Sequence, residues 1–404
     1  MISNEYSLDR FIPAIGADEY QARVRRAQAE MEKRKIDALF ITSQDNFQYF
    51  TGFSSPVWVN LTRPRYCIVP SAGDPIIISA SSNVIIVERT SWIRDIRTWV
   101  APNPADDGIT LVIDALREHS KRWHRVGAEL GTESRLTMPV GDLFRIQKSI
   151  APIELVDGMA LVMSLRYLKS RGEVDRIRKV AQIASSAFEA LPVAMHTGDT
   201  IFAACQKLKI DLLERGADGT PYVIGAAARY GYPCINLGPD GQVLNAHDVL
   251  VIDTGSTFEG YYCDFDREYA IGERTPANDS AYERVWNSSE AGLEAVRPGA
   301  RACDVWRAMA EVLGTGDVQA TGVGRMGHGL GLRMCEPPSI GPLDETMLLP
   351  GMVITLEPGI SYSVDGPKGS ERRVEIHEEN VLVTESGAEL LTKRAPRHIP
   401  VVNW

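Results

Sequence analysis

The sequence predicts a two-domain protein in which a layered α/β domain precedes an α+β domain. The chain has 404 residues, more than one hydrophobic core usually supports. Helical and strand patterns alternate over its first part, as in layered α/β domains. Beyond about residue 160, longer helical patterns are separated by strand runs, which favours helices packed on a curved antiparallel sheet. We therefore expect domains at 1–160 and 161–404.

The first domain is read from short apolar runs that lie between amphipathic stretches. The first helix is rich in Ala, Arg and Glu, and the strands that follow are bounded by turn residues. The expected elements are helices over 18–35 and 108–121, and strands over 38–42, 66–70, 75–79 and 125–127.

The second domain is expected to begin with a long helix after the segment Lys169–Glu173. Its apolar residues, from Val174 to Leu191, recur on one stripe of the helix. The further expected elements are helices over 199–215, 278–297 and 302–313, and strand runs over 221–228, 248–255, 261–271, 352–357 and 376–384.

Composition excludes several classes of partner. The net charge of −10 argues against nucleic acid or an anionic membrane surface, since both attract a basic face. We expect neither a signal peptide nor a membrane span, because no basic stretch precedes an apolar core and no apolar run reaches about 18 residues. The cysteines form no CxxC pair, which favours a reduced, cytoplasmic protein over a zinc knuckle or a disulfide framework. They are Cys67, Cys205, Cys234, Cys263, Cys303 and Cys335.

Two aspartates follow apolar runs that can pair as a hairpin. Asp253 ends the run 249–253, and Asp264 lies in the next strand. A turn centred on Phe258 and Glu259 would place Asp253 opposite Asp264, with Cβ atoms about 5 Å apart. Carboxylates that close repel each other unless a proton or a cation lies between them. A divalent metal is one solution, and two solvent-facing hairpin acids are the alternative.

One histidine and two glutamates extend this set. His328 lies within Gly327-His328-Gly329, where the backbone can approach a site closely, although a flexible loop fits as well. Glu357 follows one apolar strand and Glu378 lies in another, and a buried Glu without a partner costs several kcal/mol. Four acids and an imidazole suit two ions of Mn, Fe, Co or Zn better than Cu.

In order and spacing, these residues resemble the pita-bread family of methionine aminopeptidase, prolidase, aminopeptidase P and creatinase. That family carries an Asp, a second Asp eleven positions later, a His within Gly-His-Gly, and then two Glu. The matching residues are Asp253, Asp264, His328, Glu357 and Glu378, with Glu375 as a substitute for the last if the register differs. The stretch Asp45–Phe53 and the Lys169-Ser170 linker resemble the N-terminal domain of prolidase and creatinase.

The resemblance implies a dinuclear metal-dependent hydrolase that cleaves an amide C–N bond, like an Xaa-Pro dipeptidase or aminopeptidase. It implies two divalent ions per chain, with Mn as the first choice, and a small-molecule or dipeptide substrate. Glu357 would be the acid/base beside the bound water as well as a ligand. The resemblance also implies a homodimer, in which the segment Trp58–Arg65 would reach the site of the partner chain.

The chain departs from the family at two histidines that hold substrate or stabilise the reaction intermediate. Asn236 and Cys335 occupy these positions. Asn236 could donate a hydrogen bond through its amide, whereas a thiol is a weak donor. His377 or an arginine could take over instead. These substitutions support an alternative function, a small-molecule hydrolase or lyase similar to ectoine hydrolase, creatinase or a dimethylsulfoniopropionate lyase. A non-catalytic binding protein is a third interpretation, although such members usually lose the ligands.

Four further side chains are candidates for substrate binding. Arg372 and Arg373 could clamp a substrate carboxylate, or they could be solvated loop charges. Tyr232 and Tyr362 could line the pocket, although core or rim packing is commoner for tyrosine. The cysteines near the expected pocket also fit as small apolar fillers.

Overall fold

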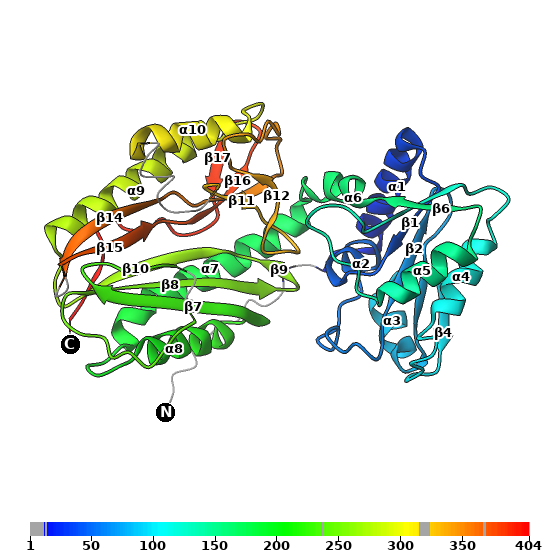
Figure 1. Ribbon diagram of the computed structural model, residues 1–404, viewed down its shortest axis with the longest axis horizontal. Coiled ribbons are helices and arrows are strands. Elements are labelled where there is room, and N and C mark those ends of the chain that lie inside the picture. The colour runs from blue at the N-terminus through cyan, green and yellow to red at the C-terminus, as the bar shows by residue number, and fades with distance from the viewer. Residues whose placement is uncertain (1–11, 13, 236–237, 315–323, 367–368, 404) are drawn as a thin grey trace. The chain divides into compact units, whose positions relative to one another are not determined.

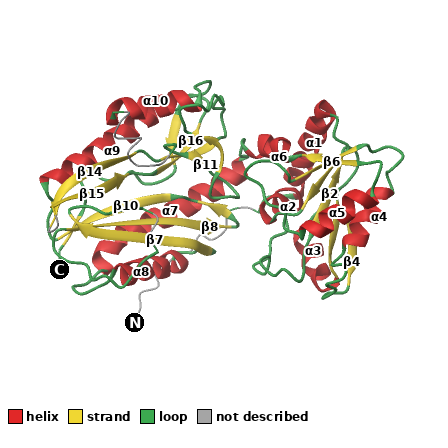
Figure 2. Cartoon of the chain, in the orientation of Figure 1, coloured by secondary structure: helices red, strands yellow, loops and turns green. Residues whose placement is uncertain are grey.

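The computed structural model describes residues 12, 14–235, 238–314, 324–366 and 369–403. The chain divides into two compact units, Ala14–Arg166 and Tyr167–Trp404 (Figures 1 and 2). The first unit is mixed α/β and the second combines helices with mostly antiparallel sheets, so the predicted fold class is confirmed. None of the helices among the described residues is long and apolar enough to cross a membrane.

A six-stranded sheet forms the centre of the first unit, in the order β4-β3-β2-β1-β5-β6. β1 pairs antiparallel with β2 and parallel with β5, and all of its residues are buried. The strands are β1 (Ala38–Ile41), β2 (Tyr66–Pro70), β3 (Ile76–Ala80), β4 (Asp95–Trp99), β5 (Arg125–Ala128) and β6 (Glu154–Asp157). The helices are α1 (Ala17–Arg34), α2 (Gln44–Thr51), α3 (Val84–Thr90), α4 (Ile109–Arg117), α5 (Val140–Ser149) and α6 (Met159–Arg166), with the 3-10 turn η1 (Ser81–Asn83).

The second unit begins with the long helix α7 (Arg171–Ala194), which confirms that prediction. Ser170 and Glu173 form a capping box: the Ser170 hydroxyl accepts from the Glu173 N–H at 3.2 Å, and the Glu173 carboxylate accepts from the Ser170 N–H at 3.0 Å. Just before the helix, buried Lys169 forms an ion pair with buried Glu336 at 3.2 Å. The start of α7 is therefore tied to the segment that follows Cys335.

Two sheets, a hairpin and further helices follow α7 in the second unit. One sheet has the order β18-β10-β8-β7 with β9 paired to β8, and the other has the order β12-β11-β13-β16-β17. The strands are β7 (Gly219–Arg229), β8 (Asp248–Phe258), β9 (Tyr261–Tyr262), β10 (Phe265–Ile271), β11 (His328–Gly329), β12 (Glu336–Ser339), β13 (Val353–Leu356), β14 (Gly359–Gly366), β15 (Gly369–Ile376), β16 (Glu379–Val383), β17 (Ala388–Leu390) and β18 (Val401–Val402). The helices are α8 (Ile201–Glu214), α9 (Pro276–Ala295) and α10 (Ala302–Leu313).

The hairpin that carries the two aspartates has a different register from the predicted one. Its turn lies at Glu259 and Gly260, which both have positive φ (49° and 83°), one residue later than expected. Asp253 consequently pairs with Asp266, so the prediction that it lies directly opposite Asp264 was wrong. The shift amounts to two residues, and side chains on a strand alternate with a period of two. Asp264 therefore still approaches Asp253 as a diagonal neighbour.

Candidate metal centre

Potential metal ligands from separate segments of the second unit converge on one place. Asp253, Asp264 and Glu378 form one group, and His328, Glu357 and Glu378 form another. Within each group the ligand atoms lie within 4.8 Å of one another. Because Glu378 belongs to both groups, it could be shared by two neighbouring ions. The structure thus brings together the five ligands of the family pattern, which are Asp253, Asp264, His328, Glu357 and Glu378.

Tyr222 on β7 orients the two aspartates. Its hydroxyl donates to Asp253 Oδ1 at 3.2 Å and also contacts Asp264 Oδ1. The tyrosine ring fits because its partner across the strands is Gly255, which has no side chain. A Cβ at Gly255 would lie only 2.2 Å from Cε1 of Tyr222. The Asp253-Thr254-Gly255 sequence therefore supplies a ligand and the space for the residue that holds it.

Backbone hydrogen bonds fix Asp264 and Glu378. Buried Asn380 on β16 accepts from the Asp264 N–H at 3.1 Å and donates to the Asp264 carbonyl, so one amide holds both sides of this residue. Asp266 Oδ1 accepts the N–H of Glu378 at 3.0 Å. Asp264 lies between β9 and β10, outside any strand. At Asp264, the hydrogen bonds with the Asn380 side chain therefore take the place of strand pairing.

The glycines beside His328 let its backbone pack closely. A Cβ at Gly327 would lie 2.1 Å from the Thr355 carbonyl oxygen, and Gly327 also has a positive φ of 133°. Burial lowers the pKa of His328 to about 4, so the imidazole is neutral at pH 7. Its Nδ1 lies 2.9 Å from the carbonyl oxygen of Gly329, which can only accept. Nδ1 is therefore the donor, and Nε2 keeps its lone pair for a metal.

Glu357 and Glu378 lie at strand ends, directly after β13 and directly before β16. Glu378 is buried, and its Oε1 has no hydrogen-bond partner among the described residues. Glu375, the alternative last ligand, belongs to none of the ligand groups found among the described residues. It accepts instead from Tyr362 and Asn278, each at 3.3 Å. The geometry therefore supports Glu378 as the ligand.

Burial and mutual repulsion raise the pKa values of the carboxyl groups in this centre. Burial raises the pKa of Asp253 to about 6, and burial followed by repulsion from Asp253 raises the pKa of Glu357 to about 7. Burial, and then Asp253, raises the pKa of Asp264 well above its usual range. Close carboxylates of this kind require protons or cations. The unpaired Glu378 oxygen and the neutral imidazole fit divalent metal ions.

Two protein-family models match this chain. Residues 175–385 match the model of Metallopeptidase family M24, and residues 23–168 match the model of the Creatinase/Prolidase N-terminal domain. The chain belongs to metallopeptidase family M24. This confirms the predicted family and shows that the chain is a metal-dependent peptidase-type enzyme.

Individual relatives of this M24 chain are dipeptidases. It is 26% identical over 378 residues to the Xaa-Pro dipeptidase of Pyrococcus furiosus, covering 92% of this chain and 97% of the relative. Its fold is similar to that of dipeptidase PepE from Mycobacterium ulcerans, with a TM-score of 0.81, 26% identity and coverage of 97% and 100%. A recombinant prolidase from Thermococcus sibiricus shares the fold, with a TM-score of 0.83, 23% identity and coverage of 96% and 100%.

Cys335, one of the two departures of this M24 chain, lies against the ligands. Its sulfur is 3.5 Å from His328 Nε2 and forms a group with Asp264 and His328 in which the ligand atoms lie within 4.8 Å of one another. Arg325 Nη2 donates to the same sulfur at 3.3 Å. Burial raises the pKa of the Cys335 thiol to about 11 in the absence of an ion. Asn236, the other departure, lies outside the described residues.

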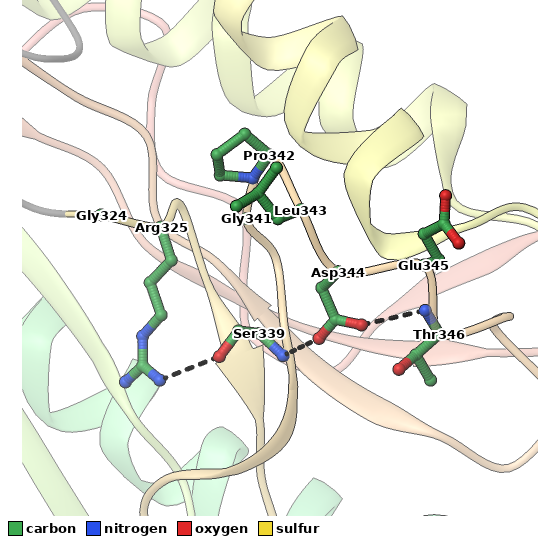
Figure 3. A pocket seen from close by; sticks show the side chains of 9 residues that line it. All are labelled: Gly324, Arg325, Ser339, Gly341, Pro342, Leu343, Asp344, Glu345 and Thr346. Atoms are coloured by element: carbon green, nitrogen blue, oxygen red, sulfur yellow. Dashed lines mark hydrogen bonds between the residues drawn. The ribbon is translucent and has the colours of Figure 1, made fainter.

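Arg325 also lines a pocket of about 890 Å³ (Figure 3). Its Nη1 donates to Ser339 Oγ at 3.4 Å, and Asp344 holds the loop by accepting from the Ser339 and Thr346 N–H groups at 2.8 and 2.9 Å. Because one end of the guanidinium touches Cys335 and the side chain lines the pocket, Arg325 connects this pocket to the ligands.

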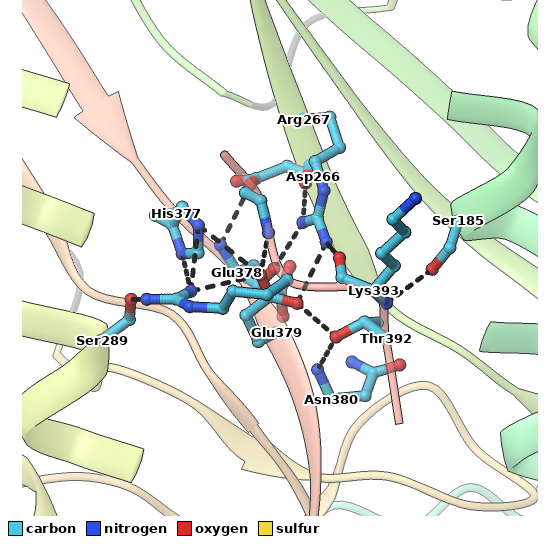
Figure 4. Close-up of polar contacts among 12 residues, drawn as sticks. Ser185, Asp266, Arg267, Ser289, His377, Glu378, Glu379, Asn380, Thr392 and Lys393 are labelled. Atoms are coloured by element: carbon cyan, nitrogen blue, oxygen red, sulfur yellow. Dashed lines mark hydrogen bonds and ion pairs between the residues drawn. The ribbon is translucent and has the colours of Figure 1, made fainter. Parts of the chain in front are cut away.

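His377, a candidate catalytic residue, takes part in a buried network instead (Figure 4). Its ring contacts Arg394 Nη1 at 3.2 Å, Glu379 Oε1 at 3.6 Å and the ring of Tyr282. Burial lowers its pKa to about 3. Burial alone would raise the pKa of Glu379, but Arg267, His377 and Arg394 outweigh it and lower that pKa to about 2. A catalytic role for His377 stays a prediction, and its contacts are those of a structural histidine.

The four candidate substrate-binding residues lie around the β14–β15 hairpin. Arg372 is exposed and its Nε donates to Ser361 Oγ, while buried Arg373 donates to the Arg229 carbonyl at 3.0 Å. Tyr232 is fully buried and its hydroxyl accepts the Ile376 N–H at 2.8 Å. Tyr362 donates to the Tyr230 carbonyl at 3.0 Å. These contacts are those of packing and hairpin stabilisation, and substrate binding by the four stays a prediction.

Sequence reasoning missed Tyr222, Asn380 and Arg325. Tyr222 lies in a strand that was expected, but its approach to the aspartates depends on the pairing of β7 with β8. Asn380 was visible only as a polar residue within an apolar strand. Arg325 precedes His328 by three positions, and this short spacing was the one available signal.

Proposed function

We propose that this M24 chain is a dinuclear metal-dependent hydrolase that cleaves the amide C–N bond of Xaa-Pro dipeptides. One observation carries the proposal: two ligand groups overlap at Glu378, with oxygen donors and one imidazole. Such donors suit Mn, Fe, Co or Zn, and Mn remains the first choice for an oxygen-rich centre. The dipeptidase relatives support the substrate class.

Each residue of the centre has a chemical task in this proposal. Bound there, divalent ions would lower the pKa of a water molecule and polarise the scissile carbonyl. Glu357, which belongs to one of the ligand groups, would lie beside the bound water and can take a proton from it and give it to the leaving nitrogen. Tyr222 keeps Asp253 and Asp264 oriented. Arg325 can donate to a substrate carboxylate or to the developing oxyanion.

The test is hydrolysis of a panel of Xaa-Pro dipeptides by Mn-loaded protein. Asp264→Ala should abolish turnover, because it removes a ligand from the centre. The matched control is Glu385→Ala, which removes a carboxylate that is exposed. Turnover that persists in Asp264→Ala, or that Glu385→Ala removes equally, would refute the assignment of the site.

The substitution at Cys335 favours a second candidate, a small-molecule hydrolase or lyase on the same scaffold. The thiol is a weak donor where the family has an imidazole, so stabilisation of a peptide intermediate would be reduced. Protein with two bound ions that turns over none of the dipeptides should then be assayed with ectoine, creatine and dimethylsulfoniopropionate. A product from any of these would establish this alternative.

Three further predictions accompany the proposal. A non-catalytic binding protein would bind less than about one ion per two chains after supplementation with metal, so metal analysis separates it from both enzyme functions. If the protein is a homodimer, sedimentation analysis at working concentration should give the mass of two chains. A cytoplasmic location predicts that the protein is found in the soluble cell fraction.

A further inference from the structure

We propose that Cys335 is itself a metal ligand, which binds through its sulfur to the ion held by His328 and Asp264. The proposal rests on the metal centre described above and adds a sixth side chain to it. The family pattern places a histidine that is not a ligand at this position, so the inference concerns this chain alone.

The backbone brings Cys335 to the centre. β11, which carries His328, pairs with β12, which begins directly after Cys335. The register shifts between His328 and Gly329, and Gly329 lies opposite Glu336. A Cβ at Gly329 would meet the Pro337 carbonyl oxygen at 2.2 Å, so only glycine permits this close approach. The segment that contains Cys335 is further held by the buried Lys169–Glu336 ion pair.

The distances between the side chains match those around a shared ion. A tetrahedral ion with a metal–sulfur bond of about 2.3 Å and a metal–nitrogen bond of about 2.05 Å separates the two ligand atoms by about 3.6 Å. The Cys335 sulfur lies 3.5 Å from His328 Nε2. The same geometry separates nitrogen and oxygen ligands by about 3.4 Å. His328 Nε2 lies 3.4 Å from Asp264 Oδ2.

The surroundings differ from those of a cysteine that merely fills space. Cys263 is fully buried, although it lies next to Asp264 in the chain, and it belongs to none of the ligand groups among the described residues. Cys335 is half-buried and faces the free lone pair of His328 and the guanidinium of Arg325, whose Nη2 lies 3.3 Å from the sulfur. On binding, the thiol would lose its proton to solvent and become a thiolate, and Arg325 would remain its hydrogen-bond donor.

A sulfur ligand changes which ions the centre prefers. Thiolates favour Zn and Co over Mn, which prefers oxygen donors. Cys335 would thus shift the ion beside His328 away from Mn, while the ion between Asp253 and Glu378 would keep mainly oxygen ligands. The two positions of the centre would then prefer different ions: the position beside Cys335 would favour Zn or Co, and the other would favour Mn.

The test is absorption spectroscopy of the Co²⁺-loaded full chain. We expect a sulfur-to-cobalt charge-transfer band in the near ultraviolet that is absent in Cys335→Ser and retained in Cys234→Ser, the control at another half-buried cysteine. Cys335→Ser should also lower the ratio of Zn²⁺ to Mn²⁺ affinity by about tenfold or more. Co²⁺ bound at two per chain without a band that depends on Cys335 would overturn the proposal and leave the metal centre intact. Failure to bind Co²⁺ at all would overturn both.

A measurement on the unmodified chain covers the case in which Cys335→Ser does not fold. Iodoacetamide labelling followed by mass spectrometry should show Cys335 protected by Zn²⁺, whereas labelling of Cys234 should not change with the metal. Equal labelling of Cys335 with and without bound Zn²⁺ would mean that the 3.5 Å contact to His328 is only a thiol hydrogen bond, and would refute coordination.

Discussion

Replacing Gly255 by alanine should damage the metal centre from a position that touches no metal. The added Cβ would lie 2.2 Å from Cε1 of Tyr222 and 2.8 Å from Cδ1. Carbon atoms that are not bonded pack at about 3.5–4.0 Å, so the tyrosine ring has to retreat by about 1.3 Å or more. Its hydroxyl lies 3.2 Å from Asp253 Oδ1, and a retreat of this size takes it beyond hydrogen-bond reach.

The expected magnitude follows from the role of Tyr222 as a partner of two ligands. Loss of such a partner typically lowers metal affinity by about 10–100-fold. Overpacking at a buried strand position should also lower the free energy of unfolding by about 1–3 kcal/mol. Tyr222→Phe should reproduce the loss of affinity with a smaller loss of stability, since the ring remains in its place.

The assay is a competition titration of Zn²⁺ against a chromophoric chelator, with Gly241→Ala as the control. No other atom lies within 4 Å of a Cβ built at Gly241, and the residue is exposed. If Gly255→Ala acts by moving the Tyr222 hydroxyl, the double variant with Tyr222→Phe should bind Zn²⁺ about as weakly as either single variant. A Gly255→Ala protein with affinity within about twofold of the unmodified chain would refute the reasoning.

Three other outcomes follow from the same contacts. Burial raises the pKa of Asp253 to about 6 and that of Glu357 to about 7, so the metal-free protein should lose stability as pH rises through these values. Calorimetry should therefore show a fall in Tm between about pH 5 and 8, and excess Zn²⁺ should remove this fall. Lys169→Met removes the ammonium group that forms a buried ion pair with Glu336. Chemical denaturation should show that the free energy of unfolding falls by roughly 3–5 kcal/mol, and a fall below about 1 kcal/mol would contradict a stabilising role for this pair. His377→Gln should lower Tm while metal analysis still finds two ions per chain, and a loss of metal would show that His377 belongs to the centre.

Much of the fold and the five ligands of the family pattern could be proposed from the sequence, with Glu375 left open as an alternative to Glu378. Apolar runs that end in an acid marked Asp253 and Glu357, and the Gly-His-Gly segment marked His328. The apolar stripe from Val174 to Leu191 marked the long helix α7, because helical periodicity is a local signal. These features depend on neighbours in the chain, so each could be proposed from local pattern, and the resemblance to the family joined them into one ligand set.

The features that could not be read depend on pairing between distant segments. The turn at Glu259 and Gly260 requires positive φ at both residues, and Glu is an uncommon residue for that conformation, so the predicted turn was one residue early. The position of Tyr222 over Gly255 follows only once β7 and β8 are in register. The β14–β15 hairpin was also missed, although its strands are consecutive in the chain, and it holds Arg373 and Tyr362 in packing contacts.

Anomalous diffraction from crystals of the metal-loaded protein tests the central claim most directly. We predict two anomalous peaks, one bordered by Asp253, Asp264 and Glu378 and the other by His328, Glu357 and Glu378, with Asp264 within reach of both. A single peak elsewhere, or no peak under saturating Mn²⁺ or Zn²⁺, would contradict a dinuclear centre and with it the proposed hydrolase.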